Sequence, residues 1–407
     1  MRVAVERVFR HESGAVLAGL IRVLGDFELA EDALQEALTR ALERWPSDGI
    51  PDRPGAWITT TARRNALDRV RRTRTARAKR DRVAVLARLE AEERAAEVSP
   101  ISPSVCDDRL RLVFTCCHPA LAREAQVALT LRTLGGLSTP EVAAALLVPV
   151  PAMAQRLVRA KRKIRDAGVP FEVPPAGALP DRLASVLAVL YLIFNEGYYS
   201  AHHPSGVRGE LCEEAIRMMR ELTQLMPHCT ESMGLRALMI LHHSRRRARG
   251  RMLEDQDRSL WMRQEIDDGL ALTRRALSLH PVGPYAIQAA IAALHAEART
   301  FEETDWIQIA ALYAELARVH PSPIVELNRA VAVSMADGAS AGLRLIDELD
   351  GSAELREYQP YHAARADLLR RAGRVDAARL AYRLALAGAP NDISRAFLAG
   401  RLAMLEG

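Results

Sequence analysis

The sequence predicts an all-α protein, and three observations support this. Ala, Leu and Arg are abundant, whereas aromatic residues make up only 5% of the 407 residues, which favours helices over sheets. Apolar residues recur at three- and four-residue spacing in several segments. Clusters of proline and glycine separate these segments. The chain is long for one hydrophobic core, so we expect about two or three domains.

The first clear helix is predicted over residues 26–45, "DFELAEDALQEALTRALERW". Its polar faces carry Asp32, Gln35 and Glu36. Pro46 and the Gly and Pro residues that follow predict a loop after it. The predicted apolar stripe consists of Leu29, Ala33, Leu34, Ala37, Leu38, Ala41 and Leu42.

A second helix is predicted over residues 55–74, "GAWITTTARRNALDRVRRTR", and it leads into a basic tract. Residues 69–82 hold eight Lys or Arg and one Asp. Residues 1–180 hold 29 basic and 22 acidic residues, a balance of +7, whereas residues 181–407 hold 27 and 29, a balance of −2. A basic tract of this kind is often only a solvated helix face. Its position after Thr60, Arg63 and Asn65 favours contact with DNA.

Residues 96–105, "AEVSPISPSV", indicate a linker, and the stretch "FTCCHPAL" at 114–121 follows it. Five cysteines are an odd number, so a disulfide framework is not expected. Adjacent ligands on a helix diverge by about 100° and do not match zinc spacing. We therefore interpret Cys116, Cys117 and His118 as packing and helix termination, with a metal or redox role as the alternative.

Residues 132–165 contain the strongest local pattern. Ser138 or Thr139 caps a helix whose first turn holds Pro140 and Glu141. The turn "VPVP" separates it from a second helix over about 152–165, which holds six basic residues and no acidic one. Two short helices joined in this way predict a helix-turn-helix whose second helix enters a major groove.

These residues resemble the extracytoplasmic-function sigma factors of bacterial RNA polymerase. The resemblance implies sigma region 2 at 1–82, a linker at 83–105 and sigma region 4 at 106–170. "AEDALQEAL" resembles the helix that docks on the beta-prime clamp helices, which assigns core-polymerase binding to Asp32, Gln35 and Glu36. "WITTTARRNALDRVRR" resembles the helix that opens the minus-10 element, although Arg64 stands where the family has Asn. The implied minus-10 residues are Trp57, Thr60, Arg63, Arg64, Asn65, Arg71 and Arg72.

The helix-turn-helix resembles region 4, which reads the minus-35 element and meets the beta flap. Its implied contacts are Met153, Gln155, Arg156, Arg159, Lys161 and Arg162, because Gln pairs with adenine and Arg with guanine. The Cys-Cys-His-Pro string is a signature of one group of these factors, which carries a tetratricopeptide-like C-terminal extension.

The extension is expected to form a helical regulatory domain over residues 181–407. "DAARLAYRLALAGAP" places Ala378, Tyr382 and Ala385 at the spacings of the second helix of a tetratricopeptide repeat. Pro281 and Pro321 close similar segments.

An aromatic segment, "YLIFNEGYYSAHH", precedes these segments. It is interpreted as core, as an intramolecular docking surface, or as a metal or small-ligand site. Its candidate residues are Asn195, Glu196, Tyr198, Tyr199, His202 and His203.

The expected partners are core RNA polymerase, promoter DNA and the chain's own C-terminal domain. No cofactor, metal or catalytic residue is expected, because no nucleophile–base pair, phosphate loop or metal spacing stands out. No apolar run of membrane-spanning length or signal peptide is seen, so we expect a cytoplasmic protein. The alternative function is a helix-turn-helix regulator with a tetratricopeptide sensor.

Overall fold

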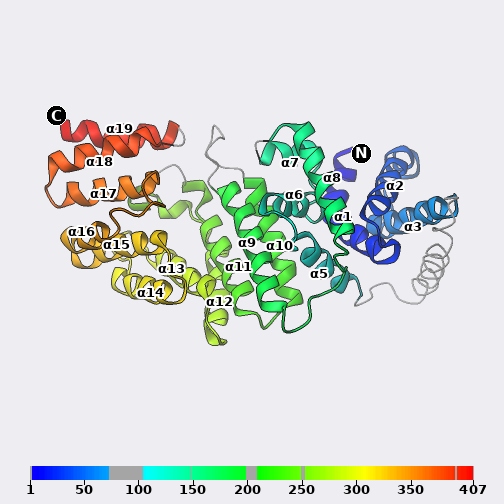
Figure 1. Ribbon diagram of the computed structural model, residues 1–407, viewed down its shortest axis with the longest axis horizontal. Helices are drawn as coiled ribbons and strands as arrows, with labels where there is room; N and C mark the ends of the chain where they lie inside the picture. The colour runs from blue at the N-terminus through cyan, green and yellow to red at the C-terminus, as the bar shows by residue number, and fades with distance from the viewer. Residues whose placement is uncertain are drawn as a thin grey trace. The chain divides into compact units, whose positions relative to one another are not determined.

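The computed structural model describes residues 2–72, 104–146, 148–198, 209–248, 253–389 and 392–406, and all regular structure in these ranges is helical (Figure 1). This confirms the predicted all-α class. The chain divides into two compact units, residues 1–192 and 193–407. Within the described ranges no single helix is long and apolar enough to cross a membrane, although α7 and α8 together form a bent pair that passes by length and composition.

The first unit begins with α1 (Arg2–Leu24), α2 (Phe27–Asp48) and α3 (Pro54–Arg72), which pack against one another. The predicted apolar stripe of α2 is wrong at two positions, because the side chains of Leu29 and Leu42 are exposed. Ala30 and Trp45 are buried and continue the stripe along the helix in their place. The sequence predicts a loop from Pro46 onward, but the helix continues through Pro46 and ends at Asp48.

The first unit continues with α5 (Ser104–Cys116), α6 (Arg123–Thr133), α7 (Thr139–Ala145) and α8 (Val150–Asp166). Helix α9 (Leu179–Tyr198) begins in this unit and ends in the second. Helix α5 packs on α1. The nearly buried Asp108 of α5 accepts hydrogen bonds from Arg22 of α1 at 2.7 Å and from Arg111 at 2.8 Å. The Arg22–Asp108 ion pair therefore joins α1 to α5.

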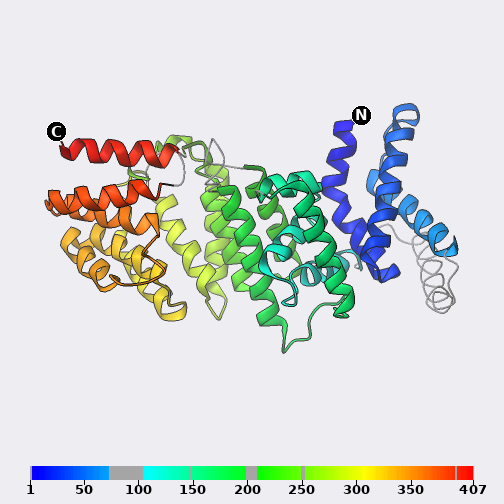
Figure 2. The ribbon, with the colours of Figure 1, turned by 45° about the horizontal axis from the view of Figure 1, so that its top comes forward.

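The second unit is a series of helices, each of which contacts its neighbours in chain order (Figure 2). That pattern is typical of stacked helical arrays. The helices are α10 (Gly209–Leu225), α11 (Thr230–His243), α12 (Arg263–Ser278), α13 (Pro284–Glu297), α14 (Trp306–Val319), α15 (Pro323–Asp337), α16 (Ala339–Glu348), α17 (Gln359–Arg371), α18 (Val375–Ala387) and α19 (Asp392–Glu406). Between α11 and α12, the described residues include the short 3-10 turns Arg246–Ala248, Leu253–Asp255 and Arg258–Leu260.

Helix α18 carries the segment that most resembles a tetratricopeptide helix. Its Ala378, Tyr382 and Ala385 are buried in a core shared with α17, as their spacing predicts. Helix α12 ends three residues before Pro281, and helix α14 ends two residues before Pro321. The helix-ending role of these prolines agrees with the sequence, while the tetratricopeptide assignment itself stays a prediction.

Candidate nucleic-acid interface

Helix α2 presents the predicted core-binding residues on the side away from its buried stripe. Asp32 and Gln35 are exposed and Glu36 is partly exposed. Asp26 caps the helix by accepting hydrogen bonds from the backbone N–H groups of Glu28 and Leu29 at 2.8 and 3.0 Å. An N-cap of this kind fixes where the helix begins.

Helix α3 presents only part of the predicted minus-10 set. Thr60 and Arg64 are exposed, and Arg63 is partly exposed. Trp57 is partly exposed and packs edge-on against the buried Trp45 of α2, with ring centroids 5.5 Å apart. The stretch of α3 from Trp57 to Arg64 therefore offers a hydroxyl, an indole and guanidinium groups.

Asn65 corrects the predicted minus-10 set. It is only 2% exposed, and its Nδ2 donates to the backbone oxygen of Ala33 in α2 at 3.4 Å. Its amide joins α3 to α2, and its burial leaves it inaccessible to a DNA partner. Arg71 and Arg72 lie within α3, but their side chains, the basic tract beyond them and the linker lie outside the described residues.

The helix-turn-helix forms as the sequence predicts. The Ser138 hydroxyl accepts from the N–H of Glu141 at 3.3 Å, and the Glu141 carboxylate accepts from the N–H of Ser138 at 2.7 Å. This capping box holds the start of α7. Helix α8 begins at Val150 with Pro151 in its first turn.

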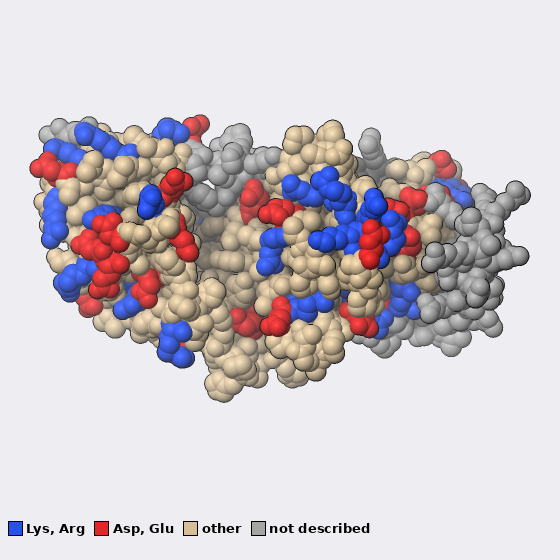
Figure 3. All heavy atoms as spheres, in the orientation of Figure 1, with Lys and Arg blue, Asp and Glu red and all other residues tan. Residues whose placement is uncertain are grey.

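Helix α8 has one buried face and one exposed basic face. The buried face consists of Met153, Leu157, Ala160 and Ile164. Gln155, Arg159 and Arg162 follow one another at spacings of four and three on the opposite, exposed face. Figure 3 shows the Lys and Arg side chains gathered over α8, with carboxylates beside them. This face has the residue types that read bases and bind phosphates.

Two residues of the predicted minus-35 set do not belong to this face. Met153 is completely buried, so it packs the domain and does not reach a base edge. Lys161 lies on the flank of α8 and pairs with Glu31 of α2, with Nζ and Oε2 2.5 Å apart and side chains only 13% and 16% exposed. Arg156 is partly exposed.

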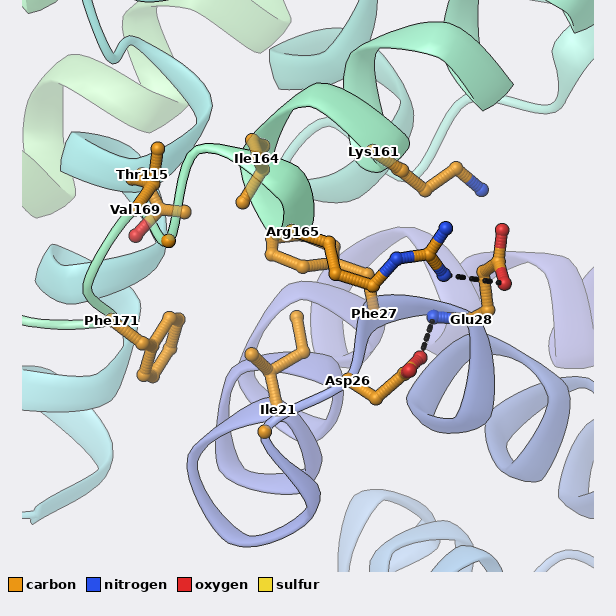
Figure 4. A pocket seen from close by; sticks show the side chains of 12 residues that line it. Ile21, Asp26, Phe27, Glu28, Thr115, Lys161, Ile164, Arg165, Val169 and Phe171 are labelled. Carbon is orange, nitrogen blue, oxygen red and sulfur yellow. Dashed lines mark hydrogen bonds and ion pairs between the residues drawn. The ribbon is translucent and has the colours of Figure 1, made fainter. Parts of the chain in front are cut away.

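A second ion pair connects the same two helices, because Arg165 lies 3.4 Å from Glu28 (Figure 4). This pair is about half exposed, so it is weaker than the Lys161 pair. A pocket of about 290 Å³ lies beside the two pairs. Its apolar lining comes from Ile21, Phe27, Ile164, Val169 and Phe171. The flank of the recognition helix thus lies against the helix with the predicted core-binding residues. Neither ion pair was foreseen from the sequence.

The Cys-Cys-His-Pro stretch ends α5, as predicted. Both thiols are fully buried against α6, with Cys116 Sγ 3.1 Å from the Thr133 hydroxyl and Cys117 Sγ 3.6 Å from that of Thr130. Burial raises the pKa of both thiols, that of Cys117 to about 11. The thiols are therefore protonated at neutral pH and poorly nucleophilic. His118 Nδ1 accepts from the N–H of Ala120 at 3.1 Å, which closes the turn.

The aromatic segment at the end of α9 packs within the second unit. The ring of Tyr198 stacks on Phe194 at 5.6 Å and meets His242 edge-on at 5.2 Å. Arg245 donates to the Tyr198 hydroxyl at 3.2 Å. These contacts support the core interpretation of Tyr198. Asn195 and Glu196 are partly exposed. Tyr199, His202 and His203 lie outside the described residues.

No group of three metal-ligating side chains occurs in the described ranges.

A capped helix-turn-helix with an exposed basic face is the architecture of a DNA-binding transcription factor. Sequence comparisons agree: residues 8–76 match sigma-70 region 2, residues 111–164 match sigma-70 region 4, and residues 182–277 match a family of unknown function (DUF6596). The chain belongs to the extracytoplasmic-function sigma-70 factors and carries a C-terminal helical extension. It directs promoter recognition as a sigma factor.

Two relatives illustrate how far the similarity extends. An uncharacterized protein of Rhizobium meliloti (strain 1021), R00370, is 44% identical over 392 residues, which cover 94% of this chain and 91% of the relative. The probable ECF RNA polymerase sigma factor SigI of Mycobacterium tuberculosis is 29% identical over 155 residues. That match covers 38% of this chain and 52% of SigI. No solved structure matches the chain.

Proposed function

We propose that α2 binds core RNA polymerase through Asp32, Gln35 and Glu36, at the beta-prime clamp helices, while region 4 meets the beta flap. The exposure of Asp32 and Gln35 on a capped, firmly packed helix supports this assignment. These residues offer carboxylate and amide groups to basic and polar side chains of a partner. The proposal extends the sigma assignment to named residues.

The minus-10 element is bound by the exposed part of α3. Thr60, Arg63 and Arg64 lie together on two turns of the helix, and Trp57 provides a partly exposed ring for an unstacked base. The Thr60 hydroxyl already donates to the Ala56 carbonyl at 3.0 Å, so towards DNA it acts as an acceptor.

The minus-35 element is read by the exposed face of α8. Gln155 and Arg159 approach base edges, and Arg162 and Arg156 approach phosphates. This capped helix-turn-helix face is the observation that carries the proposal most directly.

Regions 2 and 4 separate when the factor works. The centres of the two promoter elements are about 25 base pairs apart, or about 85 Å at 3.4 Å per base pair. Helices α2 and α8 are in contact through the Lys161–Glu31 pair. Helix α3, which packs on α2, and helix α8 do not reach both elements while α2 and α8 keep this contact. The ion pairs therefore break before both elements are engaged.

The C-terminal extension tunes this activity. Support comes from its fusion to the sigma regions and from its charge balance of −2, opposite to the +7 of residues 1–180. A helical array supplies an extended surface for such a role.

Run-off transcription with purified core polymerase on a promoter library tests the proposal. Specific transcripts with the full chain are expected. DNA binding without initiation would transfer the protein to the conventional helix-turn-helix regulators. A fragment of residues 1–198, which keeps α9 whole, tests the extension. An unchanged yield would refute regulation by the remainder of the chain.

A further inference from the structure

The end of helix α5 leaves a backbone carbonyl that its own helix does not satisfy. The N–H of His118 bonds to the oxygen of Thr115, so the usual partner of the Phe114 oxygen is directed elsewhere. Arg182 of α9 supplies the missing donor, with its Nη2 2.6 Å from the Phe114 oxygen. A guanidinium at the C-terminal end of a helix also opposes the negative end of the helix dipole.

A second arginine makes the reciprocal contact. Arg123, at the start of α6, donates through Nη1 to the backbone oxygen of Ser185 in α9 at 3.1 Å and to Gln126 Oε1 at 3.1 Å. The buried Gln126 in turn donates to the oxygens of His118 and Leu121 at 2.9 and 3.2 Å. One hydrogen-bonded path therefore runs from α9 to the backbone of the Cys-Cys-His-Pro turn.

The two contacts join segments that match different protein families. The turn lies inside the region 4 match at 111–164, whereas Arg182 is the first residue of the match to the family of unknown function at 182–277. Arg182 donates to a backbone oxygen of the turn and Arg123 to a backbone oxygen of α9, so the contact depends on the backbone geometry of both segments. The buried thiols of Cys116 and Cys117 stabilise the start of the turn by packing against Thr133 and Thr130 of α6.

We infer that the turn from Phe114 to Arg123 is the docking surface on region 4 for the first helix of the extension, and that Arg182 is the positioning residue that couples the two. The regulatory half of this inference rests on the proposed function of the extension. The docking half rests on the geometry alone. The Cys-Cys-His-Pro string is then an intramolecular interface, with no metal or redox chemistry assigned to it.

The experiment uses the full chain and measures alkylation of Cys116 and Cys117 by N-ethylmaleimide, read by peptide mass spectrometry. Arg182→Ala is expected to raise the alkylation rate about tenfold or more, because the thiols react only when the turn opens. Arg182→Lys keeps a charged donor and is expected to lie between the two. Arg263→Ala, at a 74% exposed position on α12, is the matched control and should leave the rate unchanged.

An unchanged alkylation rate in Arg182→Ala overturns the docking surface. If that variant fails to fold by circular dichroism, Arg123→Ala tests the same contact from the other side, and an unchanged rate there has the same meaning. Run-off transcription with the same proteins tests coupling: a changed yield in Arg182→Ala supports it, and a wild-type yield despite faster alkylation overturns it. If the wild-type chain supports no transcription while alkylation still rises, the proposed function fails and the docking surface stands.

Discussion

The Lys161–Glu31 ion pair gives the sharpest prediction about how the two sigma regions are held together. The change Glu31→Gln removes the charge and keeps the size of the side chain. A charge pair at about 4 Å is worth about 4 kcal/mol at an effective dielectric constant of 20 before desolvation is subtracted. Exposed pairs retain about 0–1 kcal/mol, and breaking a buried pair costs about 3–5 kcal/mol. With side chains 13% and 16% exposed, this pair lies between those limits, and we expect about 2 kcal/mol.

The expected result is tighter binding of a minus-35 duplex. While the α2–α8 ion pairs are formed, the carboxylates of α2 lie beside the basic flank of α8 and repel an approaching duplex. If DNA binds only when the α2–α8 ion pair is broken, the apparent dissociation constant equals the intrinsic constant divided by the fraction of molecules in which the pair is broken. A loss of about 2 kcal/mol then raises the affinity by about tenfold or more, since 1.4 kcal/mol is a factor of ten. Fluorescence anisotropy with the full chain and a labelled duplex measures this at fixed salt.

Two matched variants complete the test. Glu43→Gln makes the same change at an exposed site near the other end of α2 and should leave the affinity unchanged. Glu28→Gln breaks the half-exposed pair to Arg165, so its effect should be a few-fold at most. The reasoning is refuted if Glu31→Gln binds no more tightly than Glu43→Gln.

The remaining predictions concern packing, base reading and pH. Met153→Ala should cost about 2–4 kcal/mol in urea unfolding, because the side chain is fully buried, whereas Val158→Ala at a 53% exposed site of the same helix should change stability by less than about 0.5 kcal/mol; similar losses would contradict the assigned faces. Gln155→Ala should weaken the preferred minus-35 sequence by about 1–3 kcal/mol more than a scrambled one in a binding assay, and a uniform loss would mean phosphate contact only. Arg159→Ala should also lower the salt dependence of binding. Burial and two neighbouring guanidinium groups lower the pKa of His295 to about 4. The unfolded chain therefore binds a proton first, and up to about 3 kcal/mol of stability is lost as pH falls from about 6.5 towards 4. His295→Gln should flatten that part of the urea-derived pH profile, and an unchanged slope would reject the assignment.

Local sequence patterns predicted the features that neighbouring residues determine, namely helix starts and buried helix faces. The spacing of Ser138 and Glu141 predicted a capped helix start, and the structure has the reciprocal hydrogen bonds. The sequence pattern also predicts the burial of Met153, because this residue shares a helix face with Leu157, Ala160 and Ile164 at spacings of four, three and four. We assigned it to DNA by its place at the helix N-terminus, and the packing pattern was the better guide.

Contacts between distant segments were outside the reach of those patterns. Lys161 and Glu31 are 130 residues apart, and Arg182 and Phe114 are 68 apart. No periodicity relates such positions, so neither pair has a signature within its own helix. Asn65 shows the same limit. A polar residue in a basic helix predicts DNA contact, but its amide bonds to the Ala33 oxygen of α2, which local spacing does not indicate.

The paired cations of α8 also change how many ions promoter binding releases. Lys161, Arg162 and Arg165 each have a carboxylate partner among the described residues, whereas Arg156, Arg159 and Lys163 have no ion pair there. A cation already neutralised by a carboxylate exchanges one partner for another when it meets a phosphate. The counterions that leave the DNA are then offset by counterions that the freed carboxylate attracts. If α8 binds the minus-35 element as proposed, that binding is therefore less sensitive to ionic strength than the six basic residues of α8 alone imply.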